Sequence, residues 1–366
     1  MNKELYLSRL QKTRELMKEQ GVDIFFVSPS PNLRYLSGYS LSGDERLFLL
    51  VLPVRGEPFA LVNALYEVQA EIMPVSEFVF WSDGENPFLI LKAEVEKRGF
   101  PAGKAALDPS LPALFFVPLG RSFPKTEFLL GSPLMDPQRQ YKDSAELDCI
   151  RRASALADQA LEALVCRGEY WAGKAERDFA EELAAQMRKA GFETCDSIVA
   201  AGANAAVPHH ITGTAAIQRG KGLLIDFWGS FEGYFTDCSR TFFLGDPDAE
   251  FERVHGIVLE AHLAAEAAAR PGNLLGDVDA AARTVIEGHG YGRYFTHRTG
   301  HGIGMEDHEG APVAPGEKTP VKPGMVFSIE PGIYLPGKLG VRIENLVAIG
   351  EQGPEVLHRY PRELRR

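Results

Sequence analysis

The stretch LLIDFWGSFEGYFTDCSRTF (223–242) carries the pattern that decides the fold. It predicts two strands joined by a turn at residues 231–233, with Asp226 in the first strand and Asp237 in the second. Aspartate is disfavoured inside strands, and two carboxylates on paired strands repel each other unless a positive charge lies between them. A divalent cation, which favours oxygen ligands, would supply that charge. The alternative is that each aspartate caps a turn or pairs with Arg240.

A second informative segment is THRTGHGIGMEDHEG (296–310), which holds three of the nine histidines: His297, His301 and His308. Glycines flank His301 on both sides, so its backbone is expected to be tight and close to another part of the molecule. A single histidine is usually a core or surface residue. Three of them in one glycine-rich run favour a functional site.

The third segment is GMVFSIEPGIYLPGKLGVRIENLV (324–347), in which Glu330 and Glu344 each interrupt an apolar strand pattern. Glutamate is rarely buried without a partner, because an unpaired carboxylate loses much free energy when it leaves water. Each glutamate therefore needs a cation. That cation is either a metal ion or a salt-bridge partner such as Arg342 or Lys338.

Together the three segments supply an oxygen-rich set of possible ligands with a single nitrogen. The set is Asp226, Asp237, His301, Glu330 and Glu344. Such a set suits Mn²⁺, the first choice here, and also Co²⁺, Fe²⁺ or Zn²⁺. Four anionic ligands would balance two dications, and two ions ~3.5–4 Å apart can share a water and lower its pKa.

The order of these residues, in the strings TDCSRT, GHGIG, SIEPGIY and GVRIEN, resembles the metal-ligand set of the pita-bread metallopeptidases. That family includes methionine aminopeptidase, aminopeptidase P, prolidase and the metal-free creatinase. The resemblance covers roughly residues 140–350. Residues 1–130 resemble the amino-terminal domain of prolidase and aminopeptidase P, chiefly through NLRYLSGY (32–39). Methionine aminopeptidases lack that domain, so the resemblance favours the prolidase and aminopeptidase P branch.

The resemblance also implies a role for each matching ligand position. Asp226 would bind one metal with both carboxylate oxygens, and Asp237 and Glu344 would bridge the two metals. His301 and Glu330 would complete the shell of the other metal. Glu330 would in addition act as the catalytic base that takes the proton from the attacking water.

Five further residues match family positions around the substrate. His209 and His308 would contact the scissile peptide and stabilise the oxyanion of the tetrahedral intermediate. His297 would line the proline pocket. Arg342 and Tyr334 are grouped with it as substrate-site residues, at positions that orient the metal ligands. Two neighbours are not assigned to catalysis: His210 is expected at the surface, and Cys238, on the face opposite Asp237, is expected to pack in the core.

The implied reaction is hydrolysis of the peptide bond before proline, most simply in Xaa-Pro dipeptides, with short proline-containing peptides as partners. The alternative is an Xaa-Pro aminopeptidase that acts on longer peptides. Some prolidases of this family place an arginine soon after the last histidine of the GHGIG region, whereas HEGAPVAPGEKTP (308–320) has none. Arg46 is a candidate replacement for binding the substrate carboxylate. A creatinase-like non-peptidase and a non-enzymatic binding module are remote alternatives, because both would have lost the metal ligands.

The rest of the chain predicts two domains and a linker. Residues 1–130 alternate helical and strand patterns, which favours a smaller α/β domain of creatinase type. Residues 131–143 contain two prolines and little periodicity, and are interpreted as the linker. Residues 144–366 follow the order helices, strands, helices, strands. This predicts an α+β pita-bread domain with an internal pseudo-two-fold duplication, with Ser144 as the N-cap of its first helix.

The local patterns give approximate bounds for most elements. The predicted helices are 3–20, 67–74, 86–99, 144–168, 176–191, 249–269 and 276–289, and the predicted strands of the first domain are 22–28, 46–53, 57–63 and one that begins at 104.

Composition narrows the range of partners and settings. The 366 residues carry a formal net charge of −11, which argues against a nucleic acid or an anionic membrane as the main partner. Neither a signal-peptide pattern nor a run of ~20 apolar residues is present. The four cysteines show no CxxC pairing, so a reducing cytoplasm is the expected location. A homodimer is implied by the resemblance alone.

Overall fold

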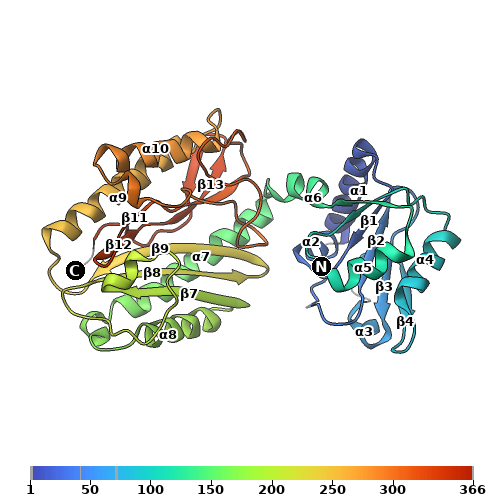
Figure 1. Cartoon of the computed structure of the whole chain (residues 1–366), viewed down its shortest axis with the longest axis horizontal. Coiled ribbons are helices and arrows are strands. Elements are labelled where there is room, and N and C mark those ends of the chain that lie inside the picture. The colour runs from blue at the N-terminus through green and yellow to red at the C-terminus, as the bar shows by residue number, and fades with distance from the viewer. Residues whose placement is uncertain (1–2, 42, 71–72, 365–366) are drawn as a thin grey trace. The chain divides into compact units, whose positions relative to one another are not determined.

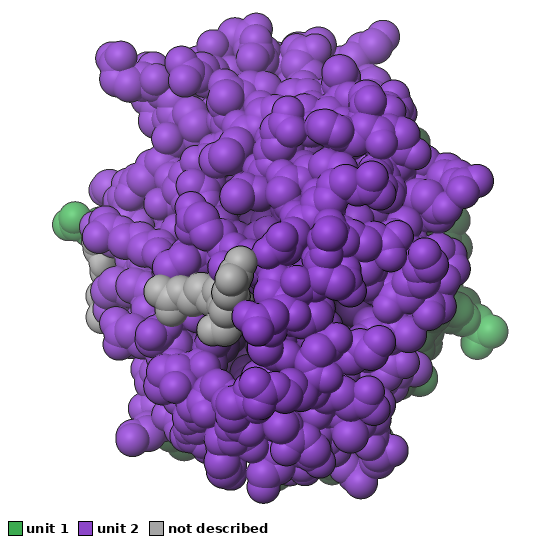
Figure 2. All heavy atoms as spheres, turned by 90° about the vertical axis from the view of Figure 1, so that its left-hand side faces the viewer, with its two compact units in different colours: residues 1–138 green, residues 139–366 purple. Residues whose placement is uncertain are grey.

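The structure is a computed structural model that describes residues 3–41, 43–70 and 73–364. The chain divides into two compact units, residues 1–138 and residues 139–366 (Figure 1), and Figure 2 distinguishes their atoms by colour. Each unit has hydrophobic clusters of its own.

Unit 1 is an α/β unit built on one mixed six-stranded sheet with the order β4-β3-β2-β1-β5-β6. Its strands are β1 (Ile24–Val27), β2 (Leu49–Pro53), β3 (Phe59–Asn63), β4 (Glu77–Trp81), β5 (Lys104–Leu107) and β6 (Glu127–Leu130). Its helices are α1 (Lys3–Gln20), α2 (Pro31–Ser37), η1 (Ala64–Tyr66), α3 (Glu67–Ala70), α4 (Pro87–Lys97) and α5 (Ala113–Ser122). Strand β2 pairs antiparallel with β1 and β3, and the other neighbours pair in parallel.

The strands predicted at 22–28, 46–53, 57–63 and 104 are confirmed, as are the helices over 3–20 and 86–99. Helices α2 and α5 and strands β4 and β6 were not predicted. Helix α5 contains Pro118, which hides a helical pattern. Helix α2 carries the NLRYLSGY string and is defined by its ends: Ser30 Oγ accepts from Leu33 N at 3.2 Å, and Gly38 adopts φ 69°. Only glycine enters that conformation without strain.

The expected linker is not irregular, because Ser132–Arg139 forms helix α6. Pro133 lies in the first turn, where a missing N–H leaves no helical hydrogen bond unmade. Leu134 and Met135 are fully buried, which offsets the interruption at Pro137. The boundary between the two units falls between Gln138 and Arg139, near the end of this helix.

Unit 2 repeats one arrangement, a pair of helices followed by strands. The first half contains α7 (Ser144–Val165), η2 (Gly168–Trp171), α8 (Glu176–Lys189), β7 (Thr194–Ala201), η3 (Gly202–Ala206), β8 (Gly222–Phe231) and β9 (Tyr234–Phe243). The second half contains α9 (Ala249–Ala268), α10 (Leu275–Gly288), η4 (Gly292–Tyr294), β10 (Val326–Ile329), β11 (Gly332–Leu335), β12 (Leu339–Arg342), β13 (Asn345–Gly350) and β14 (Gly353–Val356). This order confirms the predicted α+β class with two similar halves.

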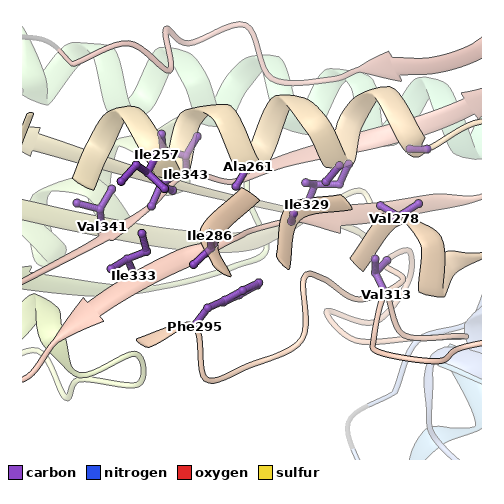
Figure 3. Close-up of a cluster of buried hydrophobic side chains, with 14 of the residues drawn as sticks. Ile257, Ala261, Val278, Ile286, Phe295, Val313, Ile329, Ile333, Val341 and Ile343 are labelled. Carbon is purple, nitrogen blue, oxygen red and sulfur yellow. The ribbon is translucent and has the colours of Figure 1, made fainter. Parts of the chain in front are cut away.

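Each half of unit 2 has its own hydrophobic core. In the first half, α7 and α8 pack on the sheet of β7, β8 and β9. In the second, Ile257 and Ala261 of α9 and Ile286 of α10 meet Ile333 and Val341 of the opposing strands (Figure 3). The strands that carry the polar side chains of the candidate site therefore pack against these cores, which hold them in place.

The N-cap of α7 is Asp143 rather than Ser144. The Asp143 carboxylate accepts from the backbone N–H groups of Ala145 and Glu146, both at 2.9 Å, and Glu146 accepts in return from Asp143 N at 3.0 Å. This reciprocal pair satisfies more of the free N–H groups at the helix start than a serine one residue later would.

Candidate active site

Asp226 and Asp237 lie on the predicted hairpin of β8 and β9. Glu232 and Gly233 form its turn, and both have positive φ. Asp226 pairs with Ser239, and Asp237 lies two residues before Ser239 on the same strand. Because alternate residues share a face, both carboxylates point to one side of the sheet. Cys238 points to the other side and is fully buried in the first core, as expected.

Glu344 reaches this hairpin from the segment between β12 and β13. Its N–H donates to the Ser239 carbonyl at 3.0 Å, and Ser239 Oγ donates to Glu344 Oε2 at 2.7 Å. A single serine therefore joins the second half of the unit to the strand that carries Asp237.

The GHGIG segment lies against β10, which ends just before Glu330. His301 N donates to Ser328 Oγ at 3.0 Å, and Ser328 N donates to the His301 carbonyl at 2.8 Å. A Cβ on Gly300 would lie 1.9 Å from the Ser328 carbonyl oxygen, and one on Gly302 would lie 2.1 Å from that of Glu309. The two flanking glycines are therefore required by close backbone approach, as their position beside His301 predicted.

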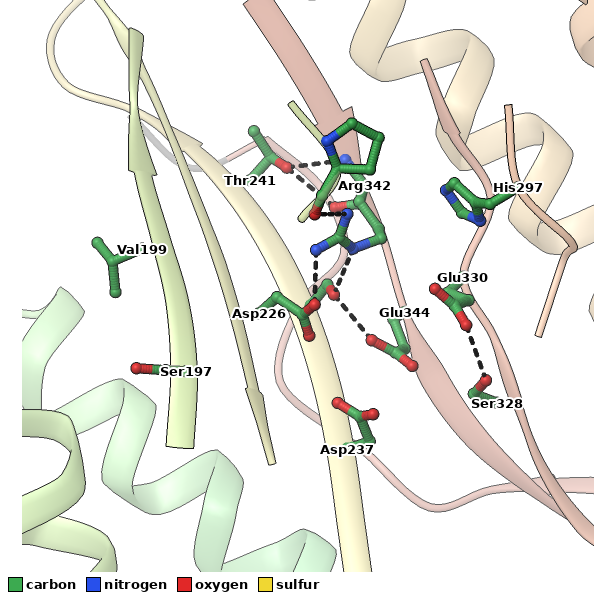
Figure 4. Close-up of polar contacts among 12 residues, drawn as sticks. Ser197, Val199, Asp226, Asp237, Thr241, His297, Ser328, Glu330, Arg342 and Glu344 are labelled. Atoms are coloured by element: carbon green, nitrogen blue, oxygen red, sulfur yellow. Dashed lines mark hydrogen bonds and ion pairs between the residues drawn. The ribbon is translucent and has the colours of Figure 1, made fainter. Parts of the chain in front are cut away.

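The five predicted ligands converge on one space (Figure 4 draws four of them). His301 Nε2 lies 3.6 Å from Asp237 Oδ2 and 3.6 Å from Glu330 Oε1, and ligand atoms of Asp237, His301 and Glu344 lie within 4.8 Å of one another. Within the set of five predicted ligands, three buried carboxylate oxygens find no hydrogen-bond donor: Asp226 Oδ1, Asp237 Oδ1 and Glu344 Oε1. Buried acceptors without a donor are costly. This donor set therefore fits divalent metal ions.

The pKa values of these groups also favour a site for divalent metal ions. Burial raises the pKa of Asp237 and of Glu344 well above the ordinary values, with neighbouring carboxylates adding to the effect, and burial raises the pKa of Glu330 to about 8. Bound cations would restore the charged forms. Burial lowers the pKa of His301 to about 3, which keeps its imidazole neutral, the form that binds metals.

Arg342 organises one wall of the site (Figure 4). Its Nη2 lies 2.5 Å from Asp226 Oδ2, its Nη1 donates to the Tyr334 hydroxyl at 2.8 Å, and its Nε donates to Ser239 Oγ at 3.0 Å. Arg342 thus fixes Asp226 directly and Glu344 through Ser239. The salt bridge proposed as an alternative for Glu330 or Glu344 goes to Asp226 instead.

His297 is held in a neutral, oriented state. Its Nδ1 donates to the Arg298 carbonyl at 2.7 Å, which leaves Nε2 to accept from the Tyr334 hydroxyl at 2.8 Å. Burial lowers the pKa of His297 to about 4, and Arg342 adds to the effect. The chain of contacts from Asp226 through Arg342 and Tyr334 ends on this ring.

A cavity of about 220 Å³ opens over the converging groups. Its lining is Ile198, Pro208, His209, Asp226, Trp228, Asp237, His297, Arg298, His301, Asp307, His308, Glu330, Arg342 and Glu344. All the site residues expected from the sequence line it except Tyr334, which lies behind the wall. Arg298 and Asp307 were not singled out from the sequence. A cation and an acid inside the histidine-rich segment were the available signal.

The loop that carries His209 is anchored by its neighbour. His210 is not a free surface residue, because its Nε2 lies 2.9 Å from an oxygen of the fully buried Glu176 side chain. Glu176 also accepts from Ala201 N at 2.8 Å and Gly213 N at 3.0 Å. His210 therefore ties the loop to α8, whereas His209 faces the cavity.

Arg46, the cation suggested for the substrate carboxylate, is engaged within unit 1. Its Nη2 and Nε bind Asp83 at 2.8 and 3.0 Å, and its Nη1 binds Glu45 at 2.6 Å.

Among the residues that the structure describes, no helix has the length and apolar character needed to cross a membrane.

Comparison with known proteins places these features in a family. Residues 148–351 match the model of metallopeptidase family M24, and residues 9–141 match that of the creatinase/prolidase N-terminal domain. The probable dipeptidase PepE of Mycobacterium tuberculosis is 33% identical over 99% of this chain and 96% of its own length. The Xaa-Pro dipeptidase of Lactobacillus delbrueckii subsp. lactis is 33% identical over 97% and 98%.

Solved structures of dipeptidases and prolidases match the chain as well. The prolidase from Thermococcus sibiricus matches with a TM-score of 0.93 and 36% identity over 98% of each chain. The dipeptidase PepE from Mycobacterium ulcerans matches with a TM-score of 0.91 and 32% identity, over 100% of this chain and 98% of the other. The chain therefore belongs to metallopeptidase family M24.

Proposed function

We propose that this chain hydrolyses the peptide bond before proline in Xaa-Pro dipeptides and uses two divalent metal ions. The observation that carries the proposal is the set of three buried carboxylate oxygens without a donor, converging with His301 and Glu330. The specificity for proline is supported by relatives named Xaa-Pro dipeptidase and prolidase.

Asp226, Asp237, His301, Glu330 and Glu344 would hold the ions, with Mn²⁺ as the proposed metal. An oxygen-rich set with one imidazole accepts Mn²⁺ and also Co²⁺, Fe²⁺ or Zn²⁺. When bound, the ions would lower the pKa of water and draw charge from the scissile carbonyl.

The remaining groups would act from the chain itself. Glu330 is assigned the proton of the attacking water, because its carboxylate lines the cavity beside His301 and can accept a proton once bound cations restore its charged form. His209 and His308 line the same cavity and are assigned the oxyanion, to which a neutral imidazole donates its N–H.

A proline substrate explains why the cavity combines polar groups with an apolar wall. The bond before proline is a tertiary amide without an N–H donor, so it must be recognised by shape and by the ends of the substrate. Ile198, Pro208 and Trp228 supply apolar lining, and the His297 ring is immobilised beside it.

Metal-stripped enzyme, reloaded separately with Mn²⁺, Co²⁺, Fe²⁺ and Zn²⁺, should be assayed on Ala-Pro, Ala-Pro-Ala and Ala-Ala. We expect hydrolysis of Ala-Pro with a metal present, and much weaker turnover of the other two peptides. Cleavage of Ala-Pro-Ala without Ala-Pro would instead identify an Xaa-Pro aminopeptidase. Failure on every peptide with every metal would reject the proposal and leave the creatinase-like alternative. Homodimerisation and a cytoplasmic location stay predictions.

A further inference from the structure

The two arginines that line the cavity use their guanidinium groups differently. Arg342 is fully engaged by Asp226, Tyr334 and Ser239. Arg298 lines the same cavity and is only half-buried. Within the residues that the structure describes, its side chain makes no hydrogen bond and no ion pair. Its donors are therefore available to a ligand in the cavity.

The backbone on both sides of this side chain is fixed. The Arg298 carbonyl accepts from His297 Nδ1 at 2.7 Å. The next residue, Thr299, donates to Asp279 Oδ1 through its N–H at 3.0 Å and through its hydroxyl at 2.8 Å, and its carbonyl accepts from Glu330 N at 2.7 Å. The guanidinium thus extends from a rigid point beside the assigned catalytic base.

Arg298 also acts electrostatically on the centre of the site. Burial raises the pKa of Glu330, and the charges of Arg342 and Arg298 both oppose that rise. The positive charge is therefore close to the reacting region, yet none of the carboxylates there binds it directly. This leaves the fork of donors for an anion from outside the chain.

We propose that Arg298 binds the free carboxylate of the substrate's C-terminal proline and so selects dipeptides over longer peptides; this rests on the function proposed above. A guanidinium matches a carboxylate with two parallel charge-assisted hydrogen bonds. In a longer peptide the carboxylate is replaced by a neutral amide, which offers one carbonyl acceptor and no charge. The cavity of about 220 Å³, below the roughly 300–1,000 Å³ typical of drug-sized ligands, also favours a small substrate.

Arg298 would supply a cation for the substrate carboxylate that the other candidate positions do not provide. The segment after His308 contains no arginine, and Arg46 is already bound by Asp83 and Glu45. Among the described residues that line the cavity, Arg298 is the arginine that forms no ion pair with an acidic side chain.

The test compares Ala-Pro with Ala-Pro amide, which differ only in the C-terminal group, a charged carboxylate in the first and a neutral amide in the second. The metal-loaded full chain should prefer Ala-Pro by roughly 10- to 100-fold in kcat/KM, the range expected for charge-assisted hydrogen bonds. Arg298→Gln should remove that preference by slowing Ala-Pro alone. Arg298→Lys should restore part of it, because lysine keeps the charge without the planar fork. Arg293→Gln, an exposed arginine five residues upstream, is the matched control and should keep the full preference.

Metal content and melting temperature of each variant establish that its fold is intact; if Arg298→Gln fails to fold, Arg298→Lys carries the comparison. An equal loss on both substrates in the Arg298 variants would overturn the inference. Equal turnover of both substrates by the unmodified enzyme would overturn it too, while leaving hydrolysis before proline standing. Turnover of neither would reject the proposed function itself. Loss of the preference in Arg298→Gln, with a partial preference in Arg298→Lys and the full preference in Arg293→Gln, supports both the inference and the proposed function.

Discussion

Lys142 Nζ donates to Glu309 Oε1 across 2.8 Å, although the two side chains are only 2% and 6% exposed. Arg139 binds the other oxygen of the same carboxylate. Burial alone would raise the pKa of Glu309, but the two positive charges hold it below its ordinary value. Because Glu309 follows His308 directly, residues 139–142 fix the loop that brings this histidine to the cavity.

Lys142→Met should therefore destabilise the protein by about 3 kcal/mol, since removal of one partner leaves a buried charge half paired. Denaturant unfolding measures this change. Lys338→Met is the control, because Lys338 meets Glu250 on an exposed surface and should cost less than about 1 kcal/mol. Equal small effects in the two variants would show that the buried pair has no structural role.

Tyr334→Phe should lower kcat/KM by about 10-fold without loss of metal, because the hydroxyl links Arg342 to His297 and its removal costs on the order of one charge-assisted hydrogen bond. Steady-state kinetics and metal analysis report the two effects separately. Tyr291→Phe removes a hydroxyl that contacts the exposed Arg253 and should leave turnover unchanged. Normal kcat/KM in Tyr334→Phe would contradict the positioning role.

Glu330→Gln should keep the fold but lower kcat by roughly 10²- to 10⁴-fold, the usual contribution of a general base, with weakened metal binding in addition. Turnover with saturating metal separates the loss of the base from the loss of a ligand. Glu355→Gln changes an exposed glutamate of β14 and serves as control. Near-normal turnover in Glu330→Gln would remove this residue from the mechanism.

The parts of the site that the sequence predicts are those with a local signal. The hairpin of β8 and β9 is visible because alternation of apolar residues, a turn at Glu232-Gly233 and two misplaced aspartates all fall within 20 residues. The glycines beside His301 are similarly informative, since a backbone that lies against Ser328 admits no side chain.

The parts that the sequence does not predict depend on distant partners. Glu176 lies 34 residues from His210, and nothing local in α8 indicates that it anchors a loop. Helix α6 is hidden by its prolines, and its stability depends on burial of Leu134 and Met135. Arg298 differs from Arg342 only in what the folded chain places around it, so its free guanidinium is visible in three dimensions alone.

Stability should fall at acidic pH through His255 of α9. Burial lowers the pKa of His255 to about 4, whereas the unfolded chain takes up this proton near pH 6.5. Its contribution is therefore complete above pH 6.5 and is lost as the pH falls toward 4, amounting to about 1 kcal/mol by pH 5.5. In denaturant unfolding of metal-free protein, His255→Phe should lose that much less stability than wild type between pH 7.5 and 5.5. His289→Phe, an exposed histidine, should follow wild type; identical pH dependence of all three proteins would contradict the assignment.

Asp237→Asn should change stability in opposite directions with and without metal. Without metal, Asp237 is a buried carboxyl group beside Glu344 and Asp226, and burial together with these neighbours raises its pKa. A neutral amide relieves that repulsion, so in the presence of chelator the variant should unfold at higher free energy than wild type, by about 1–2 kcal/mol. With saturating Mn²⁺ the order should reverse, because wild type gains binding energy that the variant lacks. Thermal unfolding in chelator and in Mn²⁺ measures both, with Asp196→Asn, an exposed aspartate of β7, as control. If Asp237→Asn were less stable in both conditions, the acid would be a structural partner rather than one of the groups whose convergence a metal ion stabilises.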